Sequence, residues 1–430
     1  MEFLFNKKLV SILLPLFFIL GSIYPTFRVL MIGSNTSTSL FEIIISIFPD
    51  IIVMLGLLLF TYNFYRNYIV GNNKIKFYII DYIVFVYIVG NILIGTFLSD
   101  NYVHSLYAFR MTYLPVFFYF IGRFHQPFDE NELESFFKYF YYWLLGVAII
   151  GILLYFPFQS IMLKMIDLSG GRKMEYFIIR MTSVFWSPVL FAPFMMIGAL
   201  YSYYKLLLKK EKKHYIFLTI FYLCLIYSVS RGSFITFILG FIILSFYIKN
   251  LKVSIISVLL LLIITFSLVI SNESFSNAFF WIFSSSIDTM SLTKGITRVE
   301  LFYKTVNDLK VNPFGYGFGK AGVLATRFYN ENTPNISYYS TDCWYLKIAC
   351  ETGLFGIITY LSILLVNTWS SFWYCLKNKH YLFFFLFLLF ILINIENLVH
   401  NLPDFYLLSQ FYWLIIGFSQ NFISINNEKH

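Results

Sequence analysis

Charged residues are scarce in this sequence. Only 12% of its 430 residues are Asp, Glu, Lys or Arg, about half of the roughly 25% that soluble domains carry. Such a chain has too little polar surface to face water, which excludes a soluble globular protein. Disordered and coiled-coil classes are excluded too, because 59% of the residues are hydrophobic and the mean hydropathy is +0.73.

Cysteine, glycine and proline are also few. The four cysteines have neither CxxC nor metal-ligand spacing, which argues against a disulfide framework. With 22 Gly and 11 Pro, the chain is not collagen-like or of low complexity. The histidines form no HExxH motif and no serine-nucleophile motif occurs. We therefore predict no metal, no cofactor and no covalent intermediate.

Long apolar runs and aromatic residues, 53 Phe and 34 Tyr, are what the sequence contains instead. A membrane span needs about 20 apolar residues, and twelve such runs can be counted. The sequence thus predicts an all-α polytopic membrane protein whose residues 1–430 form a single transmembrane domain. The predicted spans lie near 9–30, 41–61, 78–98, 103–122, 138–158, 185–204, 215–229, 233–248, 253–270, 343–368, 381–399 and 404–420.

The short loops predict the orientation, because Lys and Arg are retained on the cytoplasmic side. The basic run at 209–213 and the pairs at 74–76, 249–252 and 377–379 all fall inside if the N-terminus is cytoplasmic. An even number of spans then places the C-terminus inside as well. Two long extracytoplasmic loops follow, 159–184 and 271–342.

Arginine is enriched on the predicted outer face, whereas lysine dominates inside. Arg binds phosphate through a planar fork of donors, so this bias favours a phosphate-bearing ligand outside; the alternative is chance scatter of small numbers. Two arginines lie within or between predicted spans: Arg231 in Ser-Arg-Gly-Ser between two short spans, and Arg110 within the fourth span. A charge in the membrane costs free energy, so both are candidate site residues. Their alternative role is to pair with carboxylates or carbonyls and hold helices together.

Both long loops carry further candidates. The first contains Arg180 among hydroxyl and aromatic residues. In the second, an amphipathic helix near 296–309 is predicted to lie on the membrane and runs into Asn-Pro-Phe-Gly-Tyr-Gly-Phe-Gly. There the proline is predicted to end the helix, and the three alternating glycines, with Gly317 in the middle, to free the backbone. No strand precedes these glycines, so a dinucleotide loop is rejected.

The chain re-enters the membrane beside two carboxylates. Asp342 is the candidate general base, or alternatively the N-cap of the tenth span. Glu351 lies deeper and is predicted to pair with a buried Arg. His400 borders the last outer loop and is a supporting candidate, or simply a solvated residue.

The ordered motifs resemble the O-antigen polymerase (Wzy-type) and O-antigen ligase family of bacterial membrane proteins. The resemblance covers roughly 180–400 and rests on Arg180, Ser230-Arg231-Gly232, Asn312 to Gly319 and Asp342 to Gly356. It implies a GT-C-like fold and a glycosyltransferase that acts on glycan linked to undecaprenyl pyrophosphate. Ligases of the family typically have His where this chain has Asp342, which favours a polymerase.

The resemblance also implies residue roles and a location. Pyrophosphate would be held by Arg180, Arg231, Arg298 and Arg110. Asp342, Arg298 and Arg231 would be catalytic, and Tyr345, Glu351, Gly317 and His400 would support them. The expected location is the bacterial cytoplasmic (inner) membrane with the site facing outward, and the expected partners are lipid-linked oligosaccharides and the bilayer, with no nucleic acid. The sequence leaves three questions open: whether the polymer is O-antigen or capsule, whether a chain-length regulator binds, and whether the protein is instead a ligase, a flippase or an inactive scaffold.

Overall fold

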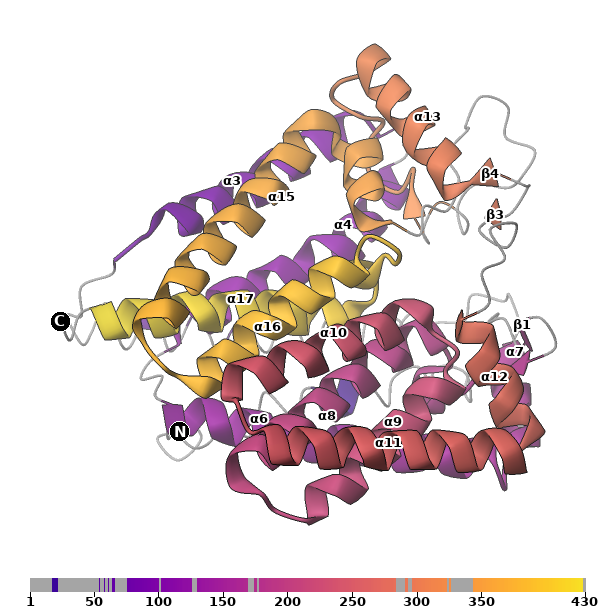
Figure 1. Cartoon of the computed structure of the whole chain (residues 1–430). Coiled ribbons are helices and arrows are strands. Elements are labelled where there is room, and N and C mark those ends of the chain that lie inside the picture. The colour runs from indigo at the N-terminus through magenta and orange to yellow at the C-terminus, as the bar shows by residue number, and fades with distance from the viewer. Residues whose placement is uncertain are drawn as a thin grey trace. The chain divides into compact units, whose positions relative to one another are not determined.

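Helices form almost all of the described structure. The computed structural model describes residues 18–21, 54, 58, 61, 64–65, 76–99, 102–125, 130–168, 174–175, 178–283, 291–292, 296–322, 325 and 343–427. Its only strands in that part of the chain are two short hairpins, β1 (Met174–Glu175) with β2 (Ile178–Ile179) and β3 (Ser291–Leu292) with β4 (Ile296–Thr297) (Figure 1). The predicted all-helical class is confirmed.

Six described helices are long and apolar enough to cross a membrane. These are α3 (Ile79–Phe97), α6 (Glu130–Tyr155), α8 (Pro188–Lys209), α10 (Arg231–Ile248), α11 (Leu251–Ser271) and α15 (Trp344–Lys377). The apolar helices α9 (Lys213–Tyr227) and α16 (Tyr381–Glu396) are shorter. The predicted spans 9–30 and 41–61 lie almost entirely outside the described residues, so the count of twelve stays a prediction.

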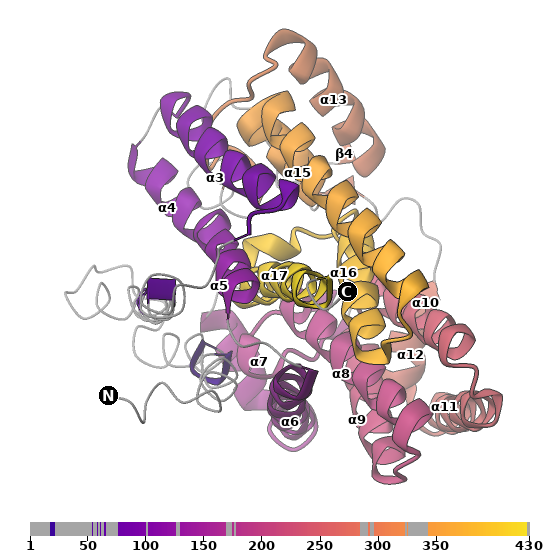
Figure 2. The same ribbon diagram turned by 90° about the vertical axis from the view of Figure 1, so that its left-hand side faces the viewer.

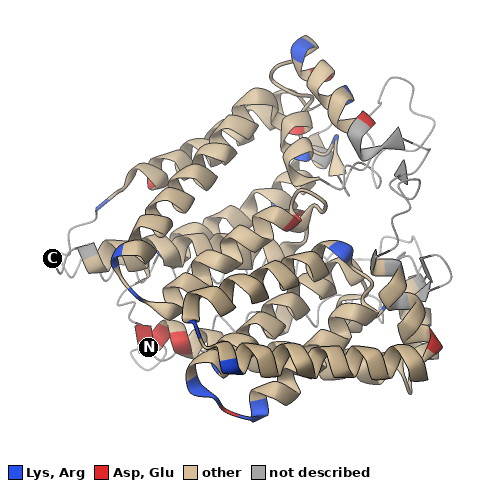
Figure 3. Ribbon diagram, viewed as in Figure 1, with Lys and Arg blue, Asp and Glu red and all other residues tan. Residues whose placement is uncertain are grey.

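Charged residues gather at helix ends and loops, and the middles of most helices carry none (Figure 3). Helix α11 has a hydropathy of 3.0 over its most apolar window, of which only 22% is buried within the protein. An apolar helix exposed in this way is suited to contact with lipid. The protein is therefore a membrane protein.

The chain forms two compact units, each described here by itself. The first comprises residues 1–56 and 127–284. Its central helix is α8, which is almost wholly buried and packs against α6, α9, α10 and α11. Gly198 of α8 lets α9 approach, because a Cβ there would lie 2.5 Å from the Phe221 ring. Between α6 and α8 lie α7 (Gln159–Leu168) and the β1–β2 hairpin, and α12 (Glu273–Phe283) follows α11.

The second unit comprises residues 57–126 and 285–430. It contains α3, α4 (Tyr102–Thr112), α5 (Phe118–Phe124), α13 (Arg298–Val311), α15, α16 and α17 (Tyr406–Asn427). Helix α17 runs between α5 and α16 (Figure 2). Gly122 of α5 makes close contact with the α17 backbone, since a Cβ there would lie 2.8 Å from the Leu414 carbonyl oxygen. Small residues permit such close helix packing in membranes.

Two predicted spans differ from the structure. The span 103–122 is not one helix: α4 ends at Thr112, a 3-10 helix with Pro115 follows over Leu114–Phe117, and α5 begins at Phe118. Pro lacks the N–H that a continuous helix requires. The span 343–368 extends to Lys377 and is interrupted at Gly353, whose φ of 65° and ψ of −152° are not helical.

Candidate functional site

The glycine-rich segment that follows α13 forms backbone hydrogen bonds with α15 on both sides of its break at Gly353. The amide of Tyr316 donates to the Cys350 carbonyl oxygen at 2.9 Å, and the amide of Gly317 donates to that of Glu351 at 3.0 Å. Beyond the break, the Leu354 amide donates to the Pro313 carbonyl oxygen at 2.8 Å. Backbone groups inside a membrane protein need such internal partners. The segment 312–322 therefore stabilises the helix at its break, because it binds backbone groups with which lipid could form no hydrogen bonds.

The alternating glycines of this segment have left-handed backbone conformations. Gly315, Gly317 and Gly319 have φ angles of 81°, 92° and 80°, which side-chain-bearing residues rarely adopt. A Cβ on Gly317 would lie 2.7 Å from the Leu98 carbonyl group, and the next amide, that of Phe318, donates to Gly95. The glycines thus allow the chain to pass between the end of α3 and the break in α15.

Two buried carboxylates share one buried lysine beside this segment. Lys347 of α15 is paired with Asp404, donates to the Thr112 hydroxyl at 2.9 Å, and lies 3.9 Å from Glu351. All four side chains are almost fully buried. Glu351 also accepts a hydrogen bond from the Gly319 amide at 3.0 Å.

This cluster corrects one prediction and adds residues that the sequence analysis missed. Among the described residues, the charged partner beside Glu351 is the buried Lys347, where an arginine was predicted. Lys347 lies four residues before Glu351 within an apolar helix, and a charge at that spacing was a signal available from the sequence. The pairing with Asp404, 57 residues away, had no such signal.

In the first unit, Arg180 binds the turn that leads into Arg231. The Arg180 Nε donates to the Ser228 carbonyl oxygen at 3.0 Å, and the next amide, that of Met181, donates to the Tyr227 carbonyl oxygen at 2.8 Å. Arg231 begins α10 three residues after Ser228. Both arginine side chains are partly exposed. The first long loop therefore brings Arg180 to the Ser-Arg-Gly turn.

Backbone strain accompanies this arginine pair. Val229, between Ser228 and Arg231, has a φ of 53°, and Ser183 and Trp186, which follow Arg180, have φ angles of 52° and 53°. A β-branched residue at positive φ is a genuine outlier. Strained residues persist where the surroundings over-determine them and tend to cluster at functional sites.

The remaining predicted residues lie in the second unit. Arg298 is the first residue of α13, and its side chain is outside the described set. Arg110 lies in the last turn of α4, with its guanidinium 5.6 Å from the centre of the Tyr107 ring. The Tyr345 hydroxyl donates to the Asn394 carbonyl oxygen at 3.0 Å, which favours a structural role. His400 is partly exposed, and its amide donates to Glu396 at 2.9 Å.

Asp342 itself lies outside the described residues. Helix α15 begins at Trp344 with Cys343 as its N-cap, and both roles predicted for Asp342 stay predictions. Over the part of the chain that the structure describes, no group of three or more His, Cys, Asp or Glu side chains could hold a metal.

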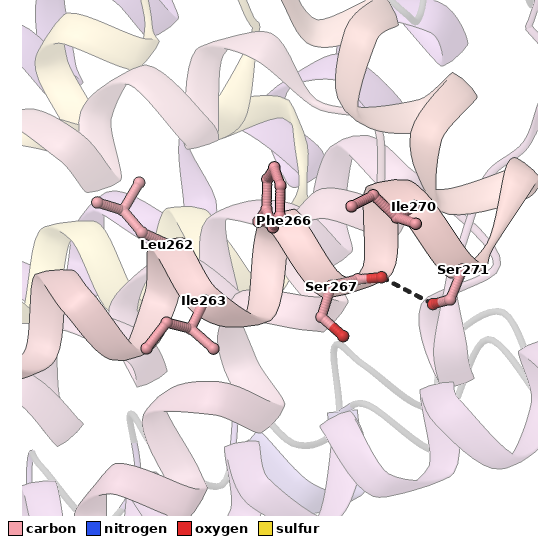
Figure 4. A pocket seen from close by; sticks show the side chains of 6 residues that line it. All are labelled: Leu262, Ile263, Phe266, Ser267, Ile270 and Ser271. Atoms are coloured by element: carbon pink, nitrogen blue, oxygen red, sulfur yellow. Dashed lines mark hydrogen bonds between the residues drawn. The ribbon is translucent and has the colours of Figure 1, made fainter.

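A groove along α11 is no candidate for catalysis. It is lined by Leu262, Ile263, Phe266, Ser267, Ile270 and Ser271 (Figure 4). The Ser271 hydroxyl donates to the Ser267 carbonyl oxygen at 2.8 Å. With no titratable group among these side chains, the groove is best suited to lipid chains.

Residues 215–361 match the family model described as O-antigen ligase. The matched region is about a third of the chain and includes Arg231, the glycine-rich segment, Lys347 and Glu351. The resemblance to the O-antigen polymerase and ligase family is thereby confirmed for this part of a helical membrane protein. No curated protein matches the chain.

Proposed function

We propose that the protein is a polysaccharide polymerase, of O-antigen or capsule, that transfers a growing glycan from undecaprenyl pyrophosphate to an incoming lipid-linked repeat unit. The observation that carries this proposal is that Arg180 binds the Ser228 carbonyl oxygen in the strained turn that leads into Arg231. The family match over 215–361 supports an enzyme that acts on lipid-linked glycans.

The chemistry requires charge stabilisation at the leaving group. The bond between the anomeric carbon and the pyrophosphate oxygen breaks, and its electron pair leaves with undecaprenyl pyrophosphate. The acceptor hydroxyl oxygen forms the new bond to the anomeric carbon and gives its proton to the Asp342 carboxylate. Preorganised arginines stabilise the charge that develops on the pyrophosphate. We assign this role to Arg180 and Arg231, with Arg298 and Arg110 as further pyrophosphate ligands.

The other predicted residues act indirectly. Glu351 and Gly317 hold the segment between α13 and α15 in place through the hydrogen bonds described above. Tyr345 and His400 border the entry to α15 and support it. The reaction needs neither a metal nor a cofactor, and takes place at the extracytoplasmic side of the cytoplasmic membrane. A chain-length regulator is an additional candidate partner.

An O-antigen ligase is the second candidate, because the matched family model is described as one. Asp342 in the position of the ligase histidine favours the polymerase. A flippase is less well supported, since transporters are commonly built from internal repeats and the polar motifs here concentrate between α9 and α16.

Gel electrophoresis of surface and lipid-linked glycans from a deletion strain distinguishes these functions. A polymerase predicts single repeat units in the deletion strain and a restored ladder on complementation. Long chains that stay on the lipid carrier would indicate a ligase. An unchanged ladder would remove both and reopen the transporter and scaffold roles.

A further inference from the structure

Several buried polar atoms near the start of α15 have no hydrogen-bond partner among the described residues. Among the residues that the structure describes, Asn397 is fully buried, and neither the nitrogen nor the oxygen of its amide has a hydrogen-bond partner. The indole N–H of Trp344 and the Oδ2 atom of Asp404 are likewise without hydrogen-bond partners, although both residues are more than nine-tenths buried.

These groups are neighbours that come from three parts of the chain. The Trp344 amide donates to the Asn397 carbonyl oxygen at 3.0 Å, which joins the start of α15 to the C-cap of α16. The Lys347 ammonium lies 5.3 Å from the centre of the Trp344 ring and is paired with Asp404, in the 3-10 helix Leu402–Asp404. Trp344 and Asp404 therefore both lie beside Lys347, and Asn397 is bonded to the backbone of Trp344.

Leaving buried donors and acceptors unpaired destabilises a fold, so such groups call for a ligand or ordered water. Here an amide offers both donors and an acceptor, an indole N–H offers a donor, and a carboxylate oxygen offers an acceptor. This mixture complements hydroxyl groups, which donate and accept at the same atom. Asp404 Oδ2 faces Gly322, where a Cβ would lie only 2.7 Å away, so glycine keeps that oxygen free of a side-chain contact.

We propose that Trp344, Asn397 and Asp404 form a subsite that binds sugar hydroxyls of the incoming acceptor unit. This inference rests on the proposed function and adds to it the residues that recognise the acceptor. Because the four atoms are buried in this conformation, binding requires a local opening of the protein.

The test compares substitutions that remove the unpaired atoms. Trp344→Phe keeps an aromatic ring and removes the indole N–H, and Asn397→Leu removes the amide at similar size. The probe is the lipid-linked single repeat unit extracted from the deletion strain, added to membranes that contain each variant. We expect its half-saturating concentration to rise about threefold to tenfold, as for the loss of one hydrogen bond. Asn397→Leu should leave the unfolding temperature equal or raise it, because buried unpaired atoms are removed. Trp344→Phe should lower it slightly, because the smaller ring leaves a cavity, so half-saturating concentrations are compared at matched protein abundance.

Trp413→Phe is the matched control. Trp413 is as buried as Trp344, its ring also packs against Tyr360, and its indole N–H likewise lacks a hydrogen-bond partner among the described residues. Its ring packs against Tyr87, whereas the Trp344 ring lies beside Lys347. We expect the control to leave the half-saturating concentration unchanged. If Asn397→Leu lowers protein abundance, Asn397→Ala provides the same comparison without added bulk.

Half-saturating concentrations of Trp344→Phe and the Asn397 variants equal to that of Trp413→Phe would overturn the subsite. A wild-type protein that incorporates no repeat units at all would instead refute the proposed function. The two failures are therefore distinguishable.

Discussion

The amide of Gly317 donates to the carbonyl oxygen of Glu351 across the break in α15, at 3.0 Å. Two residues further on, the Gly319 amide donates to the carboxylate of the same Glu351. One residue of α15 is thus bound through its backbone and its side chain by the glycine-rich segment. We infer that this segment and the broken helix form one structural module, and that changes on either side affect both.

Gly317→Ala should destabilise this module by about 1–3 kcal/mol, because alanine at this positive φ is strained and its Cβ would clash with the Leu98 carbonyl group. Thermal unfolding of the detergent-purified protein measures the change. Gly146→Ala is the control: no atom lies within 4 Å of its added Cβ, and alanine inside α6 should stabilise by about 0.5–1 kcal/mol. Equal effects of the two substitutions would contradict the prediction.

Lys347→Met should lower the free energy of unfolding by about 3–5 kcal/mol, because it leaves buried carboxylates without their counter-charge. Protein abundance in membranes and the unfolding temperature are the readouts. A second substitution, Asp404→Asn, should restore part of the loss, since the pair is coupled. Lys209→Met, which removes a largely exposed pair with Glu134, should cost only about 0–1 kcal/mol. If Lys347→Met behaved like Lys209→Met, the buried pair would not be stabilising.

Arg231→Ala should slow polymerisation by roughly 100-fold or more, as for loss of one group that stabilises transition-state charge. Arg231→Lys should recover only part of the rate, because an ammonium cannot reproduce the bidentate fork. Glycan chain length at matched protein abundance is measured, with the exposed Lys252→Ala as a control. Chains of normal length from Arg231→Ala would remove this residue from the site.

Val229→Gly relieves the strain of a positive φ but also removes a buried valine side chain, so it should lower the free energy of unfolding by about 1–2 kcal/mol. At matched protein abundance it should still shorten the glycan chains, because the turn that carries Arg231 becomes more flexible. Lys210→Gly relaxes another positive φ, 55° at the C-cap of α8. It should stabilise without changing chain length. The unfolding temperature and the glycan ladder of both variants are measured, to separate effects on stability from effects on chain length. An unaltered ladder from Val229→Gly would show that the strain has no functional role.

Local signals were sufficient to predict several site elements. The glycines at 315, 317 and 319 were predicted to free the backbone, and they adopt positive φ angles. Arg231 was singled out because a charge within apolar spans is energetically costly, and Arg180 because hydroxyl and aromatic residues accompany it in the first long loop. The interruptions at Pro115 and Gly353 were not predicted, because hydropathy averages over a window and is insensitive to a single residue that breaks a helix.

The sequence by itself determined that this is an α-helical membrane protein, because a surface with so few charged residues must face lipid and not water. Only the tertiary structure decided that Arg180 binds the Ser228 carbonyl and that Lys347 pairs with Asp404. Periodicity and spacing report which face of one helix is apolar. Partners 48 and 57 residues apart come together only when separate helices pack, and that choice depends on side-chain shape along whole interfaces.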